Sequence, residues 1–202
     1  MSKGRLYIVS GPSGSGKDTI LKEVFQKCPE IFFSISSISR PMRPGEVEGE
    51  KYHFISKDEF LKLIDDDMLL EYNQFCGNYY GSPKQPVLDA LNCGRDALLE
   101  VDVNGAAQVR KVMPEAVSIF IMPPSYAELH RRLSGRGTET EEVIGARMKT
   151  ALQEIGRACE YDYIVVNDVL SEAVDDLIGI IRSQRFKTER QINIINEVLK
   201  NA

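Results

Sequence analysis

The sequence predicts an α/β protein in which a parallel sheet is covered by helices on both faces. Short apolar runs alternate with helical patterns along the chain, which is typical of such sheets. The first apolar run, residues 5–10, leads directly into the glycine-rich segment GPSGSGKDT at 11–19, and polar pairs follow later strands at 100–102 and 167–168. Because ligands of parallel sheets bind beyond the carboxyl ends of the strands, these segments are predicted to meet in one crevice.

The glycine-rich segment has the spacing G-x-x-x-x-G-K, with Gly11, Gly16 and Lys17 at the fixed positions. Glycines let successive backbone N–H groups turn toward an anion, and the helix that follows adds its positive N-terminal end. Lys17 is expected to reach the outer phosphates, so this phosphate loop (residues 11–17) predicts a nucleoside triphosphate site. A surface turn rich in Gly and Ser is the alternative. The residues expected to contact the triphosphate are Gly11, Pro12, Ser13, Gly14, Ser15, Gly16, Lys17, Asp18 and Thr19.

The residue after the lysine departs from the usual pattern. This position normally carries Ser or Thr, whose hydroxyl holds Mg²⁺, but the chain has Asp18 there and Thr19 one position later. A carboxylate beside a triphosphate repels it unless Mg²⁺ lies between them, and carboxylates are good ligands for Mg²⁺. We therefore expect Asp18 to be a metal-side ligand. The alternative is a carboxylate that only complements the dipole at the start of the helix.

The first half of the chain predicts the start of the sheet followed by a small β-rich insertion. The expected strands are 5–10, 31–38, 52–55, 69–75 and 79–80, and the expected helices are 18–27 and 57–65. Pro29 ends the first helix, and Ser56 is placed to cap the second. A polar loop at 40–51 and a turn at 77–78 separate the short strands, so the insertion is predicted to span about 34–83.

The second half returns to the alternation of strands and helices. The expected strands are 96–103, 117–122 and 163–166, and the expected helices are 86–91, 105–112, 125–133, 138–159, one beginning at Ser171, and a tail at 192–199. Ser125 and Thr140 are the expected N-caps of two of these helices. The tail is apolar on one side, so it can pack on its own core or on a neighbouring copy, which would make a homo-oligomer.

Composition indicates a globular protein with one main domain. The 202 residues are 43% apolar and 27% charged, and the formal charge of −5 argues against nucleic acid as the main partner. The N-terminus leads straight into the first strand without a signal peptide, and no apolar stretch approaches the ~18 residues of a membrane helix. The four cysteines are scattered, so we expect free thiols, no zinc site and a cytoplasmic location.

Several longer segments are more specific than the phosphate loop. They are GPSGSGK at 11–17, SSISRPMRPGE at 36–46, GEKYHF at 49–54, GNYYGS at 77–82, LEVDVNG at 99–105, RLSGRGTETEE at 132–142 and YDYIVVND at 161–168. Together they closely resemble the guanylate kinase family, in family order across nearly the whole chain. The resemblance implies reversible, Mg²⁺-dependent transfer of the γ-phosphoryl group of ATP to GMP, and to dGMP, in purine nucleotide metabolism. The partners implied are these small molecules, without nucleic acid or membrane.

The resemblance also implies a P-loop nucleoside-monophosphate-kinase fold in three parts. These are a P-loop core of residues 1–33, 84–124 and 158–202, a GMP-binding subdomain of residues 34–83, and a helical lid of residues 125–157.

Arg40, Arg43, Tyr52 and Tyr80 are the residues that the resemblance places on the GMP phosphate. Arginine gives planar, bidentate contact to phosphate, and the tyrosines can add phenolic donors. Solvated loop arginines and core tyrosines are the alternative interpretation.

Glu71 resembles the carboxylate that reads guanine. A guanine edge offers N1–H and N2–H₂ side by side to one carboxylate, and adenine lacks this pair; a buried carboxylate left unpaired rejects the wrong base by roughly 10⁴–10⁵. Ser36 and Ser82 match positions that add hydrogen bonds to the base, and Asp102 matches a residue near GMP and the metal. Without the resemblance, Glu71 would be read as a partly exposed strand carboxylate and Asp102 as a helix cap.

Arg132, Arg136 and Arg147 match lid arginines, and Asn167 resembles a residue close to the adenine of ATP. Positioned cations stabilise charge on a migrating phosphoryl group, and a closing lid excludes water. The glycines beside Arg136 suit a hinge. The residues expected to act in the transfer are Lys17, Arg43, Arg132, Arg136 and Arg147.

Two other activities stay open. A related kinase acting on ribose 1,5-bisphosphate also carries Asp after its phosphate-loop lysine, but it is not expected to keep Glu71 and GNYYGS. Guanylate-kinase-like domains of scaffolding proteins bind phosphopeptides without catalysis and usually have a degraded phosphate loop, whereas Lys17 is intact here. Val169, where many relatives have a second Asp, is a minor departure.

Overall fold

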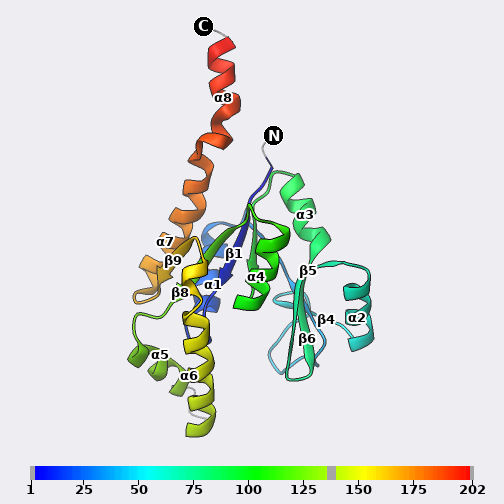
Figure 1. Ribbon diagram of the computed structural model, residues 1–202, viewed down its shortest axis with the longest axis vertical. Helices are drawn as coiled ribbons and strands as arrows, with labels where there is room; N and C mark the ends of the chain where they lie inside the picture. The colour runs from blue at the N-terminus through cyan, green and yellow to red at the C-terminus, as the bar shows by residue number, and fades with distance from the viewer. Residues whose placement is uncertain (1–2, 136–139, 201–202) are drawn as a thin grey trace.

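The computed structural model describes residues 3–135 and 140–200, and it confirms the predicted parallel sheet with helices on both faces (Figure 1). The core sheet has the strand order β2 (Phe32–Phe33), β7 (Ala97–Glu100), β1 (Leu6–Ser10), β8 (Val117–Met122) and β9 (Tyr163–Val166). Every pairing in it is parallel. The central strand β1 therefore ends between the ends of β7 and β8, where the phosphate loop begins.

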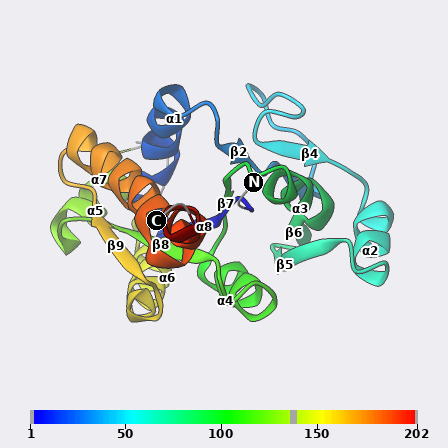
Figure 2. The same cartoon turned by 90° about the horizontal axis from the view of Figure 1, so that it is seen from above.

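Helices cover the core sheet on both faces, as Figure 2 shows from above. One face packs on α1 (Lys17–Lys27) and α7 (Leu170–Ser183), and the other on α3 (Lys84–Asn92) and α4 (Val103–Val112). Residues of β1 alternate between these two layers, with Tyr7 in the first and Ile8 in the second. All of β1 is buried, which is why its sequence is a continuous apolar run and not an alternating one.

A second, smaller sheet lies beside the core. Its strand order is β4 (Tyr52–Phe54), β3 (Ser36–Ile38), β6 (Asn78–Pro83) and β5 (Leu69–Phe75), and α2 (Lys57–Asp65) packs on it. Ser56 caps α2 as predicted, with Glu59 completing a capping box. Phe60 of α2 is fully buried and stacks on Tyr79 of β6, with ring centroids 5.4 Å apart. This small sheet with α2 is called the small body below.

The predicted strand at 31–38 is wrong, because the chain forms two short strands there. Phe32 and Phe33 pair with β7 in the core sheet, whereas Ser36–Ile38 pairs with β4 and β6 in the small sheet. The predicted strand at 96–103 is also too long. It ends at Glu100, and the carboxylate of Asp102 caps α4 by accepting the N–H groups of Asn104 and Gly105. Apolar and polar residues go on alternating through both breaks, as Ser34-Ile35-Ser36 and Glu100-Val101-Asp102, so the local pattern does not mark them.

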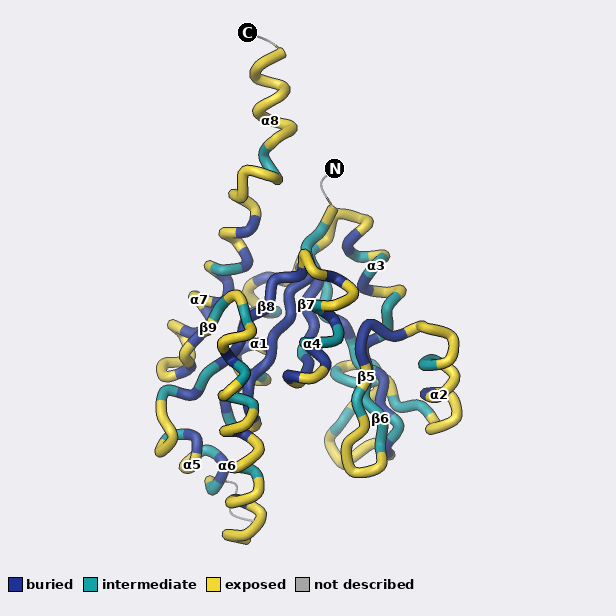
Figure 3. Tube along the Cα trace, in the orientation of Figure 1, coloured by how far each residue is buried: buried dark blue, intermediate teal, exposed yellow. Residues whose placement is uncertain are grey.

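The helices α5 (Tyr126–Ser134) and α6 (Glu141–Ile155) form an arm with its own apolar cluster on the other side of the core from the small body (Figure 1). Ser125 and Thr140 cap them as predicted. Short 3₁₀ turns, Ala158–Glu160 and Gln184–Phe186, precede β9 and the last helix, α8 (Thr188–Lys200). This helix begins before the predicted tail at 192, extends away from the core and buries none of its residues (Figure 3). None of the described helices is long and apolar enough to cross a membrane.

Phe60→Ala is expected to destabilise the small body by about 3–5 kcal/mol, because it removes the ring that fills the space between α2 and β6. Amide hydrogen exchange should show a larger loss of protection in β5 and β6 than in β1 and β8. Equal loss in all four strands would contradict the small body as a separately packed unit.

Candidate active site

A cleft of about 710 Å³ lies between the phosphate loop, the small sheet and the ends of β7 and α6. The predicted site residues that line it are Gly11, Pro12, Ser13, Gly14, Gly16, Lys17, Asp18, Thr19, Ser36, Arg43, Tyr52, Glu71, Tyr80, Asp102 and Arg132. Those that do not line it are Ser15, Arg40, Ser82, Arg147 and Asn167, and Arg136 lies outside the described residues. Predicted site residues from the phosphate loop, the small sheet and α5 thus line one cleft.

The phosphate loop is built on left-handed glycine conformations. Gly14 and Gly16 have φ of 84° and 88°, and a Cβ on Gly16 would lie 2.2 Å from Nδ2 of Asn167. The α1 helix begins at Lys17, whose Nζ donates to the carbonyl oxygen of Gly11 at 2.7 Å. The loop therefore presents a helix N-terminus and an ammonium group together, an arrangement suited to an anion.

Three side chains from distant segments hold this loop. Asn167 donates from Nδ2 to the carbonyl oxygen of Ser15 at 2.7 Å, and Arg132 donates from Nη2 to the carbonyl oxygen of Asn167 at 2.9 Å. Arg147 of α6 donates to Oγ of Ser13 at 2.7 Å. Arg132 also donates from Nη1 to the carbonyl oxygen of Ser15 at 3.4 Å, so the arm contacts the loop through both of its described predicted arginines.

Glu71 on β5 is 7% exposed and lies opposite Ser82 of β6. Its Oε1 accepts a hydrogen bond from Ser82 Oγ at 2.7 Å. Burial raises the pKa of Glu71 to about 7; the charge of Asp102 adds to this rise, and the bond from Ser82 opposes it. A Cβ on Gly105 would lie 2.6 Å from Oε2, so α4 approaches the carboxylate as closely as only glycine allows.

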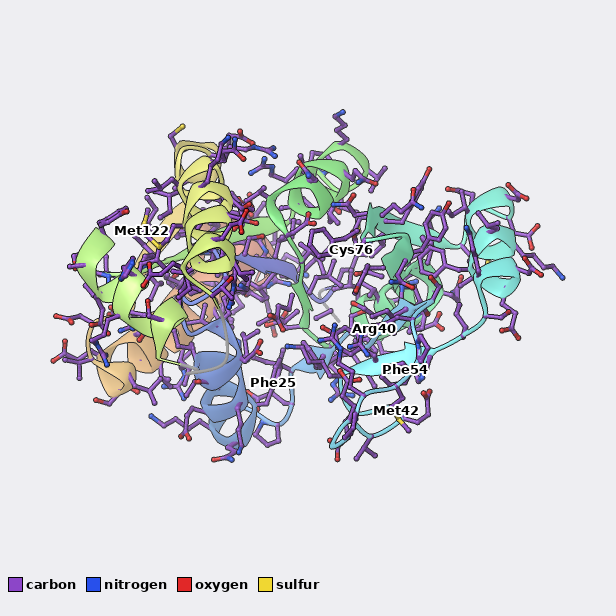
Figure 4. The ribbon with its side chains drawn as sticks, turned by 90° about the horizontal axis from the view of Figure 1, so that it is seen from below. Phe25, Arg40, Met42, Phe54, Cys76 and Met122 are labelled. Carbon is purple, nitrogen blue, oxygen red and sulfur yellow. The ribbon has the colours of Figure 1, made fainter. Side chains whose placement is uncertain are left out.

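Arg40 is 9% exposed and already has a carboxylate partner. Its guanidinium forms a bidentate pair with Glu46, at 2.5 and 2.7 Å, and lies over the rings of Tyr52 and Phe54. Figure 4 shows Arg40 beside Phe54 on the small body. Glu46 also accepts the backbone N–H of Arg43, and the hydrogen bonds from Arg40 and Arg43 lower the pKa of Glu46 to about 2. Arg40 shapes the loop that carries Arg43 into the cleft.

Lys51 is a cleft residue that the sequence analysis did not identify. Its Nζ donates to Oδ1 of Asp18 at 2.6 Å and lies 3.3 Å from Oε2 of Glu100. Burial works against the charge of Lys51, but Glu100 and Asp18 outweigh it and hold its pKa above the ordinary value. The Lys51 and Asp18 side chains are 40% and 72% exposed, and pairs this open contribute only about 0.2–1 kcal/mol.

Other cleft residues were also missed. Asn73 donates to Oδ2 of Asp102 at 2.7 Å, which connects β5 to the start of α4, and Phe75 lies at the end of the same strand. Glu154 at the end of α6 also lines the cleft, and burial raises its pKa. Two signals pointed to Lys51: it lies within the segment GEKYHF at 49–54, and it directly precedes Tyr52. Its contacts across the cleft leave no local pattern.

The cleft offers limited metal-binding groups. Within residues 3–135 and 140–200, no three His, Cys, Asp or Glu side chains converge as a metal cluster. Asp18 and Glu100 do place two carboxylates around one ammonium group beside the phosphate loop. Mg²⁺ is commonly held by one or two carboxylates together with substrate phosphates, so this pair fits a metal that arrives with a nucleotide.

Comparisons with known proteins give one consistent result. Residues 3–184 match the sequence profile of the family described as guanylate kinase. A guanylate kinase of Carboxydothermus hydrogenoformans is 47% identical over 94% of this chain and 93% of its own, and one of Shewanella violacea is 44% identical over 98% and 97%. A crystal structure of guanylate kinase from Anaplasma phagocytophilum superimposes with a TM-score of 0.78 at 34% identity, covering 94% of this chain and 90% of its own.

Glu71→Gln is expected to stabilise the ligand-free protein at high pH. The pKa of this carboxyl rises from 4.5 to about 7 on folding, so the folded state binds the extra proton between those values and loses stability as the pH rises through them. The amide has no charge to bury, so the gain in unfolding free energy over wild type should grow between pH 4.5 and 7, to at most about 3 kcal/mol.

Urea denaturation of both proteins at pH 4, 6 and 8 measures this gain. A gain that is the same at all three pH values would contradict a buried Glu71 carboxylate with a raised pKa.

Proposed function

The chain belongs to the guanylate kinase family and phosphorylates GMP with ATP, and we propose how the residues of its cleft divide that work. The observation that carries the proposal is that Glu71, a nearly buried carboxylate bonded to Ser82, lines the same cleft as Lys17. A site for a base and a site for a triphosphate thus face one another. This juxtaposition is what direct transfer between two nucleotides needs, since the reacting groups must be held in line.

We propose that the phosphate loop and Thr19 hold the triphosphate of ATP, with Lys17 at the outer phosphates. The support is the left-handed glycines and the N-terminus of α1, which aim N–H groups and a dipole at an anion. Asn167, which holds the carbonyl of Ser15, is proposed to lie at the adenine end of the site.

We propose that Glu71 reads guanine through N1–H and N2–H₂, with Ser36 and Ser82 adding hydrogen bonds and Asp102 nearby. Ser36 and Asp102 line the cleft with Glu71. The same buried carboxylate disfavours the rivals: ribose 1,5-bisphosphate has no base to satisfy it, and a phosphopeptide site has no need of it.

The GMP phosphate is proposed to lie against Arg43, Tyr52 and Tyr80, which all line the cleft. Arg40 can join them only by exchanging its bidentate carboxylate partner, Glu46, for the phosphate.

The transfer itself is proposed to use Lys17, Arg43, Arg132, Arg136 and Arg147, whose charges stabilise the migrating phosphoryl group. We propose that residues 125–157 act as a lid and residues 34–83 as the GMP-binding subdomain. Both would close on a core of residues 1–33, 84–124 and 158–202. The contacts of Arg132 and Arg147 with the loop support a lid that already touches the ATP side.

We propose Mg²⁺ as the cofactor, held by Asp18 and Glu100 together with ATP phosphates. Mg²⁺ supplies charge neutralisation and a fixed geometry for the phosphates when it is bound. We also propose a cytoplasmic location, where ATP and GMP are available and thiols stay reduced, as they are in Cys28, Cys76, Cys93 and Cys159.

A panel of phosphate acceptors tests this function. With ATP and Mg²⁺, GMP and dGMP are expected to be phosphorylated far faster than AMP, UMP or ribose 1,5-bisphosphate. Glu71→Gln should lower kcat/KM for GMP by at least ~1.5 kcal/mol, because one acceptor oxygen becomes a donor, while leaving ATP affinity unchanged. Turnover of ribose 1,5-bisphosphate in place of GMP would overturn the proposal, and an equal loss of ATP affinity would remove Glu71 as the base reader.

We propose that α8 pairs with α8 of a second copy. The helix has 13 residues and buries none, although Ile192, Ile195, Val198 and Leu199 form an apolar stripe spaced three or four apart. A helix of this length is marginal in water without a partner.

Ile195→Glu should therefore dissociate the oligomer, whereas Asn193→Glu, on the side of the helix away from the stripe, should not. Sedimentation equilibrium over a range of concentrations measures this. A wild-type protein that is monomeric throughout would contradict the pairing.

A further inference from the structure

Lys51 links three parts of the fold that meet at the cleft. It directly precedes β4 in the small body, its Nζ donates to Asp18 at the start of α1, and the same Nζ lies 3.3 Å from Glu100 at the end of β7. Its neighbour in the chain is Tyr52, which also lines the cleft. Lys51 thus lies in the chain beside a residue of the proposed GMP site, and its ammonium group bonds to Asp18 next to the proposed ATP site.

Lys51 lies against two carboxyl groups, and burial together with the charge of Asp18 raises the pKa of Glu100, which Lys51 opposes. These side chains lie beside a loop whose other features, Lys17 and the N-terminus of α1, favour an anion. Two carboxylates without a cation would repel a triphosphate from that loop. Some cation must therefore stay with Asp18 and Glu100 whenever ATP is close, and Lys51 supplies it in the ligand-free protein.

We propose that Lys51 is a further catalytic residue, which serves as the counter-ion of Asp18 and Glu100 until Mg²⁺ and ATP are bound and then stabilises the phosphoryl group only during its transfer to GMP. The proposal rests on the function proposed above. Lys51 leaves the carboxylates because one ammonium cannot match a divalent ion for two oxygen ligands. Its position beside Tyr52 then brings its charge to the place where the two phosphates meet.

Lys17 cannot take this part. Its Nζ bonds to the carbonyl of Gly11 within the phosphate loop, so it moves with ATP alone. Lys51 directly precedes β4 of the small body, so its release from Asp18 removes one link between that body and α1 while the ammonium group stays in the cleft. The Asp that stands in place of the usual hydroxyl therefore has a role in the ligand-free state, as the anchor of Lys51.

Calorimetry of ATP binding, with Mg²⁺ and with a chelator in its place, tests the exchange. The measured quantity is the Mg²⁺ effect, defined as the dissociation constant with chelator divided by the dissociation constant with Mg²⁺. Lys51→Met should increase this ratio about fivefold, because the competing cation is gone and metal-free ATP meets two bare carboxylates. Lys51→Arg, which keeps the charge, should stay near wild type. Lys62→Met, the same change on the exposed face of α2, is the matched control and should leave the ratio unchanged.

The same variants are then assayed with ATP and GMP. Lys51→Met should lower kcat about tenfold or more while binding of ATP with Mg²⁺ holds or improves, a split that loss of folding cannot produce. A Mg²⁺ effect that is unchanged or smaller in Lys51→Met would overturn the counter-ion role. An increased Mg²⁺ effect with unchanged kcat would overturn the catalytic role.

The two levels of the argument can fail separately. Wild-type protein that shows the Mg²⁺ effect and its increase in Lys51→Met, but does not phosphorylate GMP, would overturn the proposed function and leave the counter-ion role supported.

Discussion

The arrangement of the cleft depends on how the central strand β1 ends. This strand is buried along its whole length and pairs with β7 on one side and β8 on the other, so its direction is fixed. The chain must turn sharply beyond Ser10, and it does so through glycines whose φ angles other residues rarely adopt. The neighbouring strands end at the same edge. Glu100, at the end of β7, therefore lines the same cleft as the phosphate loop, and Asn167, after β9 one strand further out, bonds to Ser15 within the loop.

The sequence predicted those features that depend on local chemistry. The phosphate loop, the caps at Ser56, Ser125 and Thr140, and the alternation of strands and helices each follow from residues close together in the chain. Contacts between distant segments were not predictable in this way. The break between β2 and β3 has no clear local mark, because apolar and polar residues go on alternating across Ser34 and Ile35 and only the partners change, from β7 to β4 and β6. Lys51 was missed for the same reason: nothing near it in the sequence reveals that Asp18 and Glu100 lie within reach.

Burial of the Glu71 carboxylate lowers the stability of the folded protein. A carboxylate is costly to bury, and among the residues that the structure describes Ser82 is its one side-chain donor, within an environment that favours its neutral form. The close approach of α4 at Gly105 keeps it buried. A ligand with two N–H donors relieves that cost, whereas one that lacks them leaves it in place. Discrimination between ligands and the loss of stability therefore have the same origin, the removal of Glu71 from water.

Cationic side chains of the cleft already bond to acceptors within the protein. The chain carries a formal charge of −5, and its cleft is lined by cationic side chains interspersed with carboxyl groups. Without nucleotides, Lys17 bonds to the Gly11 carbonyl, Arg132 to Glu128 and the Asn167 carbonyl, and Lys51 to Asp18. Binding of phosphates must exchange these acceptors, so the free energy gained is the difference between two sets of contacts. A kinase needs such a difference to be small, because the products carry the same phosphates and must leave after each transfer.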